Sequence, residues 1–435
     1  MDLAEAVRIA RGRVKLEGRS DASLAKQVTG YARRVPVTSR AAGLKDGILL
    51  SPGEALHRLA VATRPRPHDD VGELNRLWGL ARYHAFFDRS SGPLGVSAAG
   101  RQIVGTQRRH TSEDLGIGFG VLLAEHWLQA SLPGAVNMVD PVDVDVALRA
   151  GLVIAGRKIP TKVDKKRYPD YLLVVNDTSS PSRFHIRALE CKGSANLGTV
   201  VRQLARAAGQ LDSLEVDGKT PTGLAVATVS PGGSLRASGR PRARATMSYR
   251  AVELPGHEQV YTVPTRLLIP GAGALTPRQI VRRRPDQVMA DNRTRIFDLG
   301  DVLPEPLLAT AIRISWTRLA GIAAHPAAAR LWTPGSDDYE QVNNPPERPR
   351  VDTPYGTAVG TSISISIGGQ TLTVSFGVEK TIDDALSLAD PDAVLNAQAE
   401  FATNLPQGNQ TAQATDESQA YSASPDGAIF SLVLG

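Results

Sequence analysis

Residues 168–192 read YPDYLLVVNDTSSPSRFHIRALECK and contain two strand-like runs. The run DYLLVV is apolar and partly β-branched, and the run FHIRALEC alternates apolar with polar side chains. Residues 223–229, GLAVATV, are typical of a short buried strand, and residues 197–214 before them place apolar side chains at helical spacing. The order of helix, strands, helix and strand predicts an α/β domain over residues 106–270.

Glu190 and Lys192 stand two residues apart in the second run. Because successive side chains of a strand point to opposite faces, we expect Glu190 and Lys192 on one face and Cys191 on the other. If Asp170 begins a neighbouring strand, its carboxylate meets that of Glu190 and gives two hard oxygen ligands for Mg²⁺ beside an ammonium group. The carbonyl oxygen of Cys191 is a further candidate ligand. The alternative is a Glu/Lys pair at a sheet edge, with Asp170 as an acid in a turn.

Phosphodiester hydrolysis needs these chemical groups. A dication neutralises charge on the phosphate and lowers the pKa of a water, and a second cation orients that water or stabilises the pentavalent transition state. Lys192 is the candidate for the second role.

The charge of the chain is unevenly distributed. The net charge is +6, and because eight acidic and no basic residues follow Lys380, residues 1–380 carry +14. Such a field favours polyanions, so nucleic acid is the expected partner. The alternative is an arginine-rich surface that reflects a high-GC genome. The candidate phosphate contacts are Lys162, Lys165, Lys166 and Arg167 before the first strand, and Arg202 and Arg206 on the helix after the second.

Pro169–Asp170 followed by Glu190-Cys191-Lys192 resembles the motif of the PD-(D/E)xK nuclease superfamily. The resemblance covers residues 110–230, about a quarter of the chain. It implies a restriction-endonuclease-like mixed sheet flanked by helices, with Asp170 and Glu190 as metal ligands and Lys192 as the catalytic lysine. It also implies a glutamate on the first core helix. Glu113 is favoured because it opens the predicted helix, and Glu125 is the competitor.

Three further local patterns lie close to this motif. A helix is expected to begin near His110, with Thr111 or Ser112 as its cap. Within it, GIGFG at 116–120 is typical of close helix packing. Gln203 and Gln210 are seven residues apart and could face the site together, but two polar positions at the core edge are the favoured interpretation.

The remaining chain divides into three regions. Helical patterns at 3–33 and 52–87 predict a helical N-terminal domain over 1–105. A helical segment is expected over 271–335, and a β-rich module with an acidic polar tail over 336–435. In that module, SISISI, two glycines and QTLTVSF predict a β-hairpin.

The amino-acid composition excludes several kinds of site and location. The single cysteine excludes an internal disulfide and a cysteine-rich zinc site, and no apolar stretch is long enough to cross a membrane. The N-terminus lacks the apolar core of a signal peptide, so a cytoplasmic location is expected.

The sequence therefore predicts a nuclease that depends on Mg²⁺ or Mn²⁺ and acts on DNA rather than RNA, as an endonuclease in bacterial restriction or phage defence. The alternative is a non-catalytic protein that uses a nuclease-like fold to bind nucleic acid or a partner. A homo-oligomer is compatible with either function.

Overall fold

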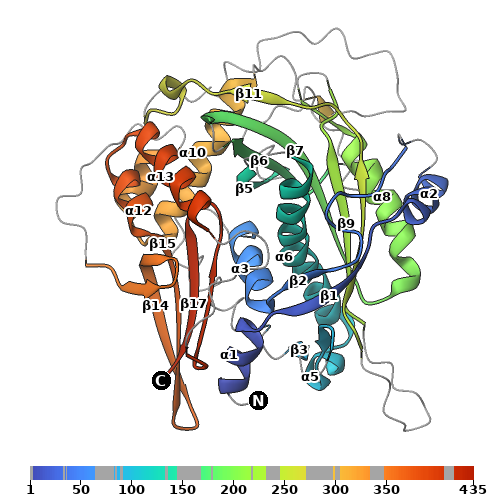
Figure 1. Ribbon diagram of the computed structural model, residues 1–435, viewed down its shortest axis with the longest axis horizontal. Helices are drawn as coiled ribbons and strands as arrows, with labels where there is room; N and C mark the ends of the chain where they lie inside the picture. The colour runs from blue at the N-terminus through green and yellow to red at the C-terminus, as the bar shows by residue number, and fades with distance from the viewer. Residues whose placement is uncertain are drawn as a thin grey trace.

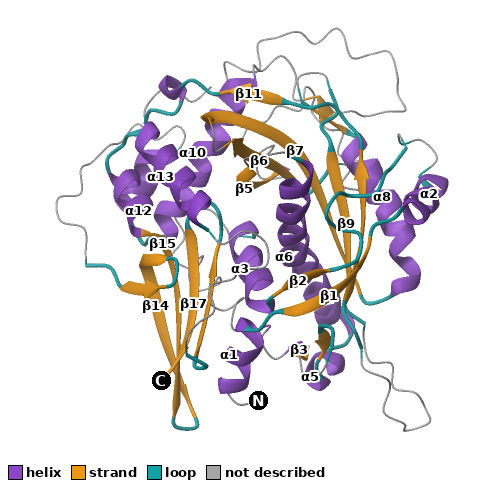
Figure 2. Cartoon of the chain, viewed as in Figure 1, coloured by secondary structure: helices purple, strands orange, loops and turns teal. Residues whose placement is uncertain are grey.

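Two large β-sheets and two short two-stranded sheets, with helices between and around the large ones, make up the described part of the computed structural model (Figures 1 and 2). The structure describes residues 3–32, 35, 37–63, 83, 86–88, 92–132, 136–144, 168–177, 180–216, 219–231, 245–270, 297–298, 304–333, 347–405 and 416–435.

The larger sheet has eight strands and is mixed, as the sequence predicted for the central segment. Its strands in spatial order are β2 (Ile48–Leu50), β1 (Val14–Arg19), β10 (Ser248–Leu254), β9 (Gly223–Val229), β7 (Ser180–Ser194), β6 (Tyr171–Asp177) and β5 (Val136–Asp143), and β11 (Val260–Thr262) pairs with β7 near its start. Strands β5, β6 and β7 are antiparallel neighbours, whereas β7 and β9 are parallel. A parallel pair needs a crossover connection, and the connection here contains α8 (Val200–Asp212).

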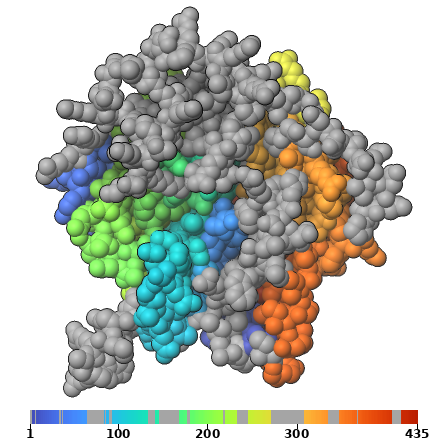
Figure 3. All heavy atoms as spheres, turned by 180° about the vertical axis from the view of Figure 1, so that it is seen from behind, coloured from blue at the N-terminus to red at the C-terminus, as the bar shows by residue number. Residues whose placement is uncertain are grey.

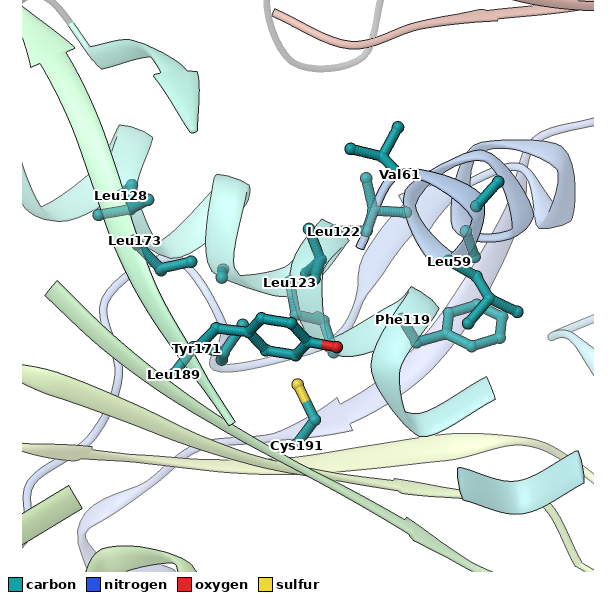
Figure 4. Close-up of a cluster of buried hydrophobic side chains, with 14 of the residues drawn as sticks. Leu59, Val61, Phe119, Leu122, Leu123, Leu128, Tyr171, Leu173, Leu189 and Cys191 are labelled. Atoms are coloured by element: carbon teal, nitrogen blue, oxygen red, sulfur yellow. The ribbon is translucent and has the colours of Figure 1, made fainter. Parts of the chain in front are cut away.

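Helices cover both faces of this sheet. On one face α6 (Gly105–Ser131) packs on β7, and α3 (Pro52–Ala62) packs on α6. On the other face lie α8 and, beside it, α2 (Ala22–Tyr31). Figure 4 shows the core on the α6 side, where the side chains of Tyr171 and Cys191 lie near Phe119 and Leu123. No helix among the described residues is long and apolar enough to span a membrane.

Helix α6 approaches the backbone of β7 without an intervening side chain. A methyl group at Gly116 would lie 2.7 Å from the backbone nitrogen of Gly193, well inside van der Waals contact. One turn later, Gly120 faces the sulfur of Cys191, and between them Gly118 faces α3. The glycines of GIGFG therefore allow close packing on a strand as well as on a helix.

The smaller sheet is antiparallel and lies near the C-terminus. Its strands in spatial order are β13 (Arg350–Thr353), β14 (Gly356–Ile367), β15 (Gln370–Glu379), β17 (Ala428–Leu434) and β16 (Gln419–Ala423). The predicted hairpin is confirmed as β14 and β15, joined by Gly368 and Gly369, whose φ angles of 61° and 82° suit glycine. The accompanying helices are α10 (Pro304–Ile322), α11 (Pro326–Trp332), α12 (Lys380–Ser387) and α13 (Pro391–Asn404).

Short elements complete the description. They are α1 (Leu3–Arg11), β3 (Phe87–Asp88), β4 (Gly95–Val96), α5 (Ala98–Gln102), β8 (Leu214–Glu215), β12 (Phe297–Asp298) and the 3₁₀ helices η2 (Leu197–Thr199) and η3 (Thr265–Leu267).

Helices α3 and α6 lie between the two sheets (Figure 1) and carry a buried polar network that joins them to the smaller sheet. The guanidinium of Arg58 donates two hydrogen bonds to the Glu125 carboxylate, at 2.6 and 3.0 Å, and one to the carbonyl oxygen of Ala423 at 3.0 Å. The neighbouring His57, fully buried, lies 2.9 Å from the hydroxyl of Ser422 through Nδ1. The C-terminal end of β16 is thus held by His57 and Arg58 of α3.

Two predictions near the N-terminal half are wrong. Residues 14–19 form β1 and not part of a helix, because Val14 and Leu16 alternate into the core while β1 pairs with β10 and β2. Helix α6 begins at Gly105 and not near His110, and Arg108 fixes its first turns by donating to the carbonyl oxygen of Gly100 at 3.1 Å. Residues 64–82 of the predicted helix at 52–87 lie outside the described residues. The domain boundaries remain predictions.

Several acidic residues after Lys380 make defined contacts. Asp383 accepts two hydrogen bonds from Arg348 at 2.7 and 2.8 Å, Asp390 caps α13, and Asp426 is buried. Residues 406–415 of the polar segment lie outside the described residues.

A substitution tests the contact between α6 and β7. Gly116→Ala should lower the free energy of unfolding by about 1–3 kcal/mol, because the new methyl group must displace the backbone of β7. Gly30→Ala is the control: its Cβ would meet nothing within 4 Å, and alanine favours a helix by up to ~1 kcal/mol. Urea denaturation measures both. Equal stability of the two variants would show that the helix does not rest on the strand.

Candidate active site

Asp170 and Glu190 come together because β6 and β7 are antiparallel and in a defined register. Tyr171 pairs with Leu189, so the residue before one lies beside the residue after the other. The backbone N–H of Asp170 donates to Glu190 Oε2 at 2.8 Å, and the backbone N–H of Cys191 donates to Asp170 Oδ2 at 2.9 Å. Each carboxylate is therefore held by the backbone of the other segment.

Lys192 lies beside Glu190, two residues further along the same strand. Its ammonium group contacts Glu190 Oε1 and donates to Oε1 of Gln210, on α8, at 2.9 Å. The side chain of Lys192 is 26% exposed, whereas that of Glu190 is fully buried. The prediction that Glu190 and Lys192 share a face is confirmed, and Cys191 faces α6 as expected.

The Glu190 carboxylate is in an environment that disfavours its charge. Burial raises the pKa of Glu190 to about 8, and the nearby charge of Asp170 contributes to the rise, while Lys192 opposes it. A dication between the two carboxylates would offset both the burial and the like-charge repulsion.

These residues fit a hard dication better than a soft one. Asp170 and Glu190 provide carboxylate oxygens, the ligands that Mg²⁺ prefers. Within the described ranges, no group of three or more His, Cys, Asp or Glu residues is arranged to hold a metal ion. A site with two protein carboxylates suits Mg²⁺, which keeps several of its waters. The Cys191 carbonyl stays a predicted ligand.

The structure does not bring either helix glutamate to Asp170 and Glu190. Glu113 lies in the third turn of α6, so the reason for favouring it, that it opens the helix, is wrong. Its side chain is 55% exposed, and its carboxylate lies 3.5 Å from Nδ1 of His110. Glu125 is buried in the ion pair with Arg58 and belongs to the link between α3 and α6. A metal-ligand role for Glu113 thus rests on the resemblance alone.

The candidate phosphate contacts divide into two groups. Lys162, Lys165, Lys166 and Arg167 lie outside the described residues. Arg202 and Arg206 are exposed on α8, whose green surface is visible beside the blue surface of α2 in Figure 3. They lie on the helix that carries Gln210, so that helix links an exposed basic surface to the site.

Gln210 contacts the site directly, and its favoured interpretation as a core-edge residue is wrong. Besides accepting from Lys192, it donates through Nε2 to the carbonyl oxygen of Tyr168 at 3.0 Å. The spacing of seven from Gln203 places both residues on one helix face. What the sequence could not show is which of the two lies opposite Lys192.

The raised pKa of Glu190 leads to a stability prediction. Because the folded protein holds a proton at Glu190 that the unfolded chain releases near pH 4.5, its stability without metal should fall as pH rises from about 4.5 to 8. Glu190→Gln removes this titration and should be more stable than wild type at pH 8, on the order of a few kcal/mol. Thermal unfolding at pH 5 and pH 8 in EDTA measures it.

Glu400→Gln, at an exposed position of α13, is the control and should keep the wild-type pH dependence. If Glu190→Gln retains that dependence too, Glu190 is not the titrating group.

Comparisons of the chain with models of protein families, with curated protein sequences and with solved structures gave no match. The groups that the structure brings together at the candidate site are Asp170, Glu190, Lys192 and Gln210.

Proposed function

We propose that the chain is a nuclease that depends on Mg²⁺ or Mn²⁺, hydrolyses phosphodiester bonds in DNA, and is a member of the PD-(D/E)xK superfamily. The observation that carries the proposal is the convergence of Asp170, Glu190 and Lys192 where β6 begins and β7 nears its end. A carboxylate with a strongly raised pKa beside a charged partner is typical of functional sites. The mixed sheet with helices on both faces also supports it.

In the proposed reaction, Asp170 and Glu190 hold the metal ion through carboxylate oxygens. When bound, Mg²⁺ neutralises charge on the phosphate and lowers the pKa of a water. Glu190 must release its proton to become a ligand, so metal binding should strengthen as pH rises towards 8.

Lys192 supplies the positive group of the reaction. Once Glu190 serves as a ligand, the ammonium of Lys192 can donate a hydrogen bond to the attacking water or to a phosphate oxygen that gains charge in the transition state. Its side chain is partly exposed, so a substrate can reach it.

The basic surface supports DNA as the substrate. Residues 1–380 carry +14, and Arg202 and Arg206 are exposed on the helix that contacts the site. Phosphate contacts of this kind give affinity without sequence specificity. The role in bacterial restriction or phage defence stays a prediction from the sequence.

Loss of the aspartate carboxylate should remove cleavage. Asp170→Asn keeps an oxygen that can accept from the N–H of Cys191 but loses the charge of a metal ligand, so nicking of supercoiled plasmid with Mg²⁺ or Mn²⁺ should fall at least ~100-fold. Asp392→Asn, an exposed position of α13, is the control. Wild-type cleavage by Asp170→Asn would mean that the metal site lies elsewhere.

If the wild type binds DNA and RNA but cleaves neither, the non-catalytic alternative holds.

Lys192 should separate catalysis from binding. Lys192→Ala should lose cleavage by ~10²–10³-fold, because it removes one charge that stabilises the transition state. DNA affinity should remain within about twofold, since affinity rests on many phosphate contacts. Fluorescence anisotropy over a salt series measures binding beside the plasmid assay. A parallel loss of both would assign Lys192 to binding.

A further inference from the structure

We propose that Gln210 is a positioning residue that fixes the Lys192 ammonium and ties it to the backbone that leads into Asp170. The statement that holding Lys192 matters for catalysis rests on the proposed function. The statement that α8 restrains Lys192 rests only on the two hydrogen bonds of Gln210.

The two bonds of Gln210 leave its amide only one orientation. An ammonium group has donors and no acceptor, so Lys192 must face the amide oxygen of Gln210. A backbone carbonyl only accepts, so Tyr168 must face the amide nitrogen. A flipped amide would lose both bonds, and no carboxylate or ammonium side chain could make both.

The position of Gln210 gives these bonds a consequence for the site. Tyr168 is two residues before Asp170, whose carboxylate is bonded to the N–H of Cys191. Gln210 therefore connects the lysine at the end of β7 to the segment that presents the first metal ligand. Without it, the ammonium of Lys192 would be held chiefly by Glu190, the same group that the metal ion requires.

Two substitutions at this position separate its two bonds. Gln210→Met keeps the approximate size of the side chain and loses both bonds. Gln210→Glu keeps an acceptor for Lys192, adds a negative charge beside it and loses the donor to Tyr168. Gln203→Met is the matched control, because Gln203 lies seven residues earlier on the same helix and its amide oxygen has no hydrogen-bond partner in the described structure.

The first measurement is the mobility of the Lys192 side chain, followed by NMR relaxation of carbon-13 at Cε over the ten lysines of the chain. Gln210→Met removes the acceptor and should lower the order parameter of Lys192 Cε by about half, whereas Gln210→Glu keeps an acceptor and should leave it close to the wild-type value. A loss of packing alone would lower the order parameter in both variants. Gln203→Met should match the wild type.

The second measurement is plasmid cleavage. Gln210→Met should lower kcat by about 10–100-fold with KM for DNA unchanged, as expected for loss of a residue that orients a catalytic group, and Gln210→Glu should recover part of the loss.

The mobility of Lys192 decides the inference. If Gln210→Met leaves it unchanged, or if both variants at 210 raise it equally, Gln210 does not hold Lys192. If Gln210→Met does not fold, Gln210→Asn takes its place, because its shorter amide cannot reach both Lys192 and Tyr168; higher mobility of Lys192 then supports the inference and unchanged mobility overturns it. A wild type that cleaves nothing would end the proposed function, while the mobility would still show whether Gln210 restrains the lysine.

Discussion

The contact of α6 with the backbone of β7 determines how the candidate site is built. Because Gly116 and Gly120 let the helix rest on the strand, the β7 residues that face these two glycines are small, Gly193 and Cys191. The alternation of the strand then places Glu190 and Lys192 on the opposite face, against α8. The same packing that completes the hydrophobic core thus directs the charged residues towards the helix that carries Gln210.

The burial of Glu190 beside Asp170 works against the stability of the fold. A protein selected only for stability would not bury Glu190 beside a second carboxylate, since the charged form loses its hydration. The backbone amides of Asp170 and Cys191 and the ammonium of Lys192 offset part of this cost. A local arrangement that works against folding, within a sheet otherwise well packed, is what a functional site is expected to look like.

The sequence predicts what is encoded locally. The strand period alone placed Glu190 and Lys192 together, and two glycines between alternating runs identified the hairpin of β14 and β15. It failed where distant residues decide: β1 is a strand because it pairs with β10, far away in the chain, and Arg108, near the start of α6, donates a hydrogen bond to the carbonyl oxygen of the distant Ser230. Glu125 could not be assigned from sequence, because its partner, Arg58, lies on another helix.

The buried network of His57, Arg58 and Glu125 has a consequence for how this chain can vary. Removing the smaller sheet would take away the partners of His57 and Arg58 in β16 and would expose to water an ion pair that is otherwise buried. Shortening, fusion or exchange of the C-terminal part is therefore constrained by the polar groups of α3 that β16 covers.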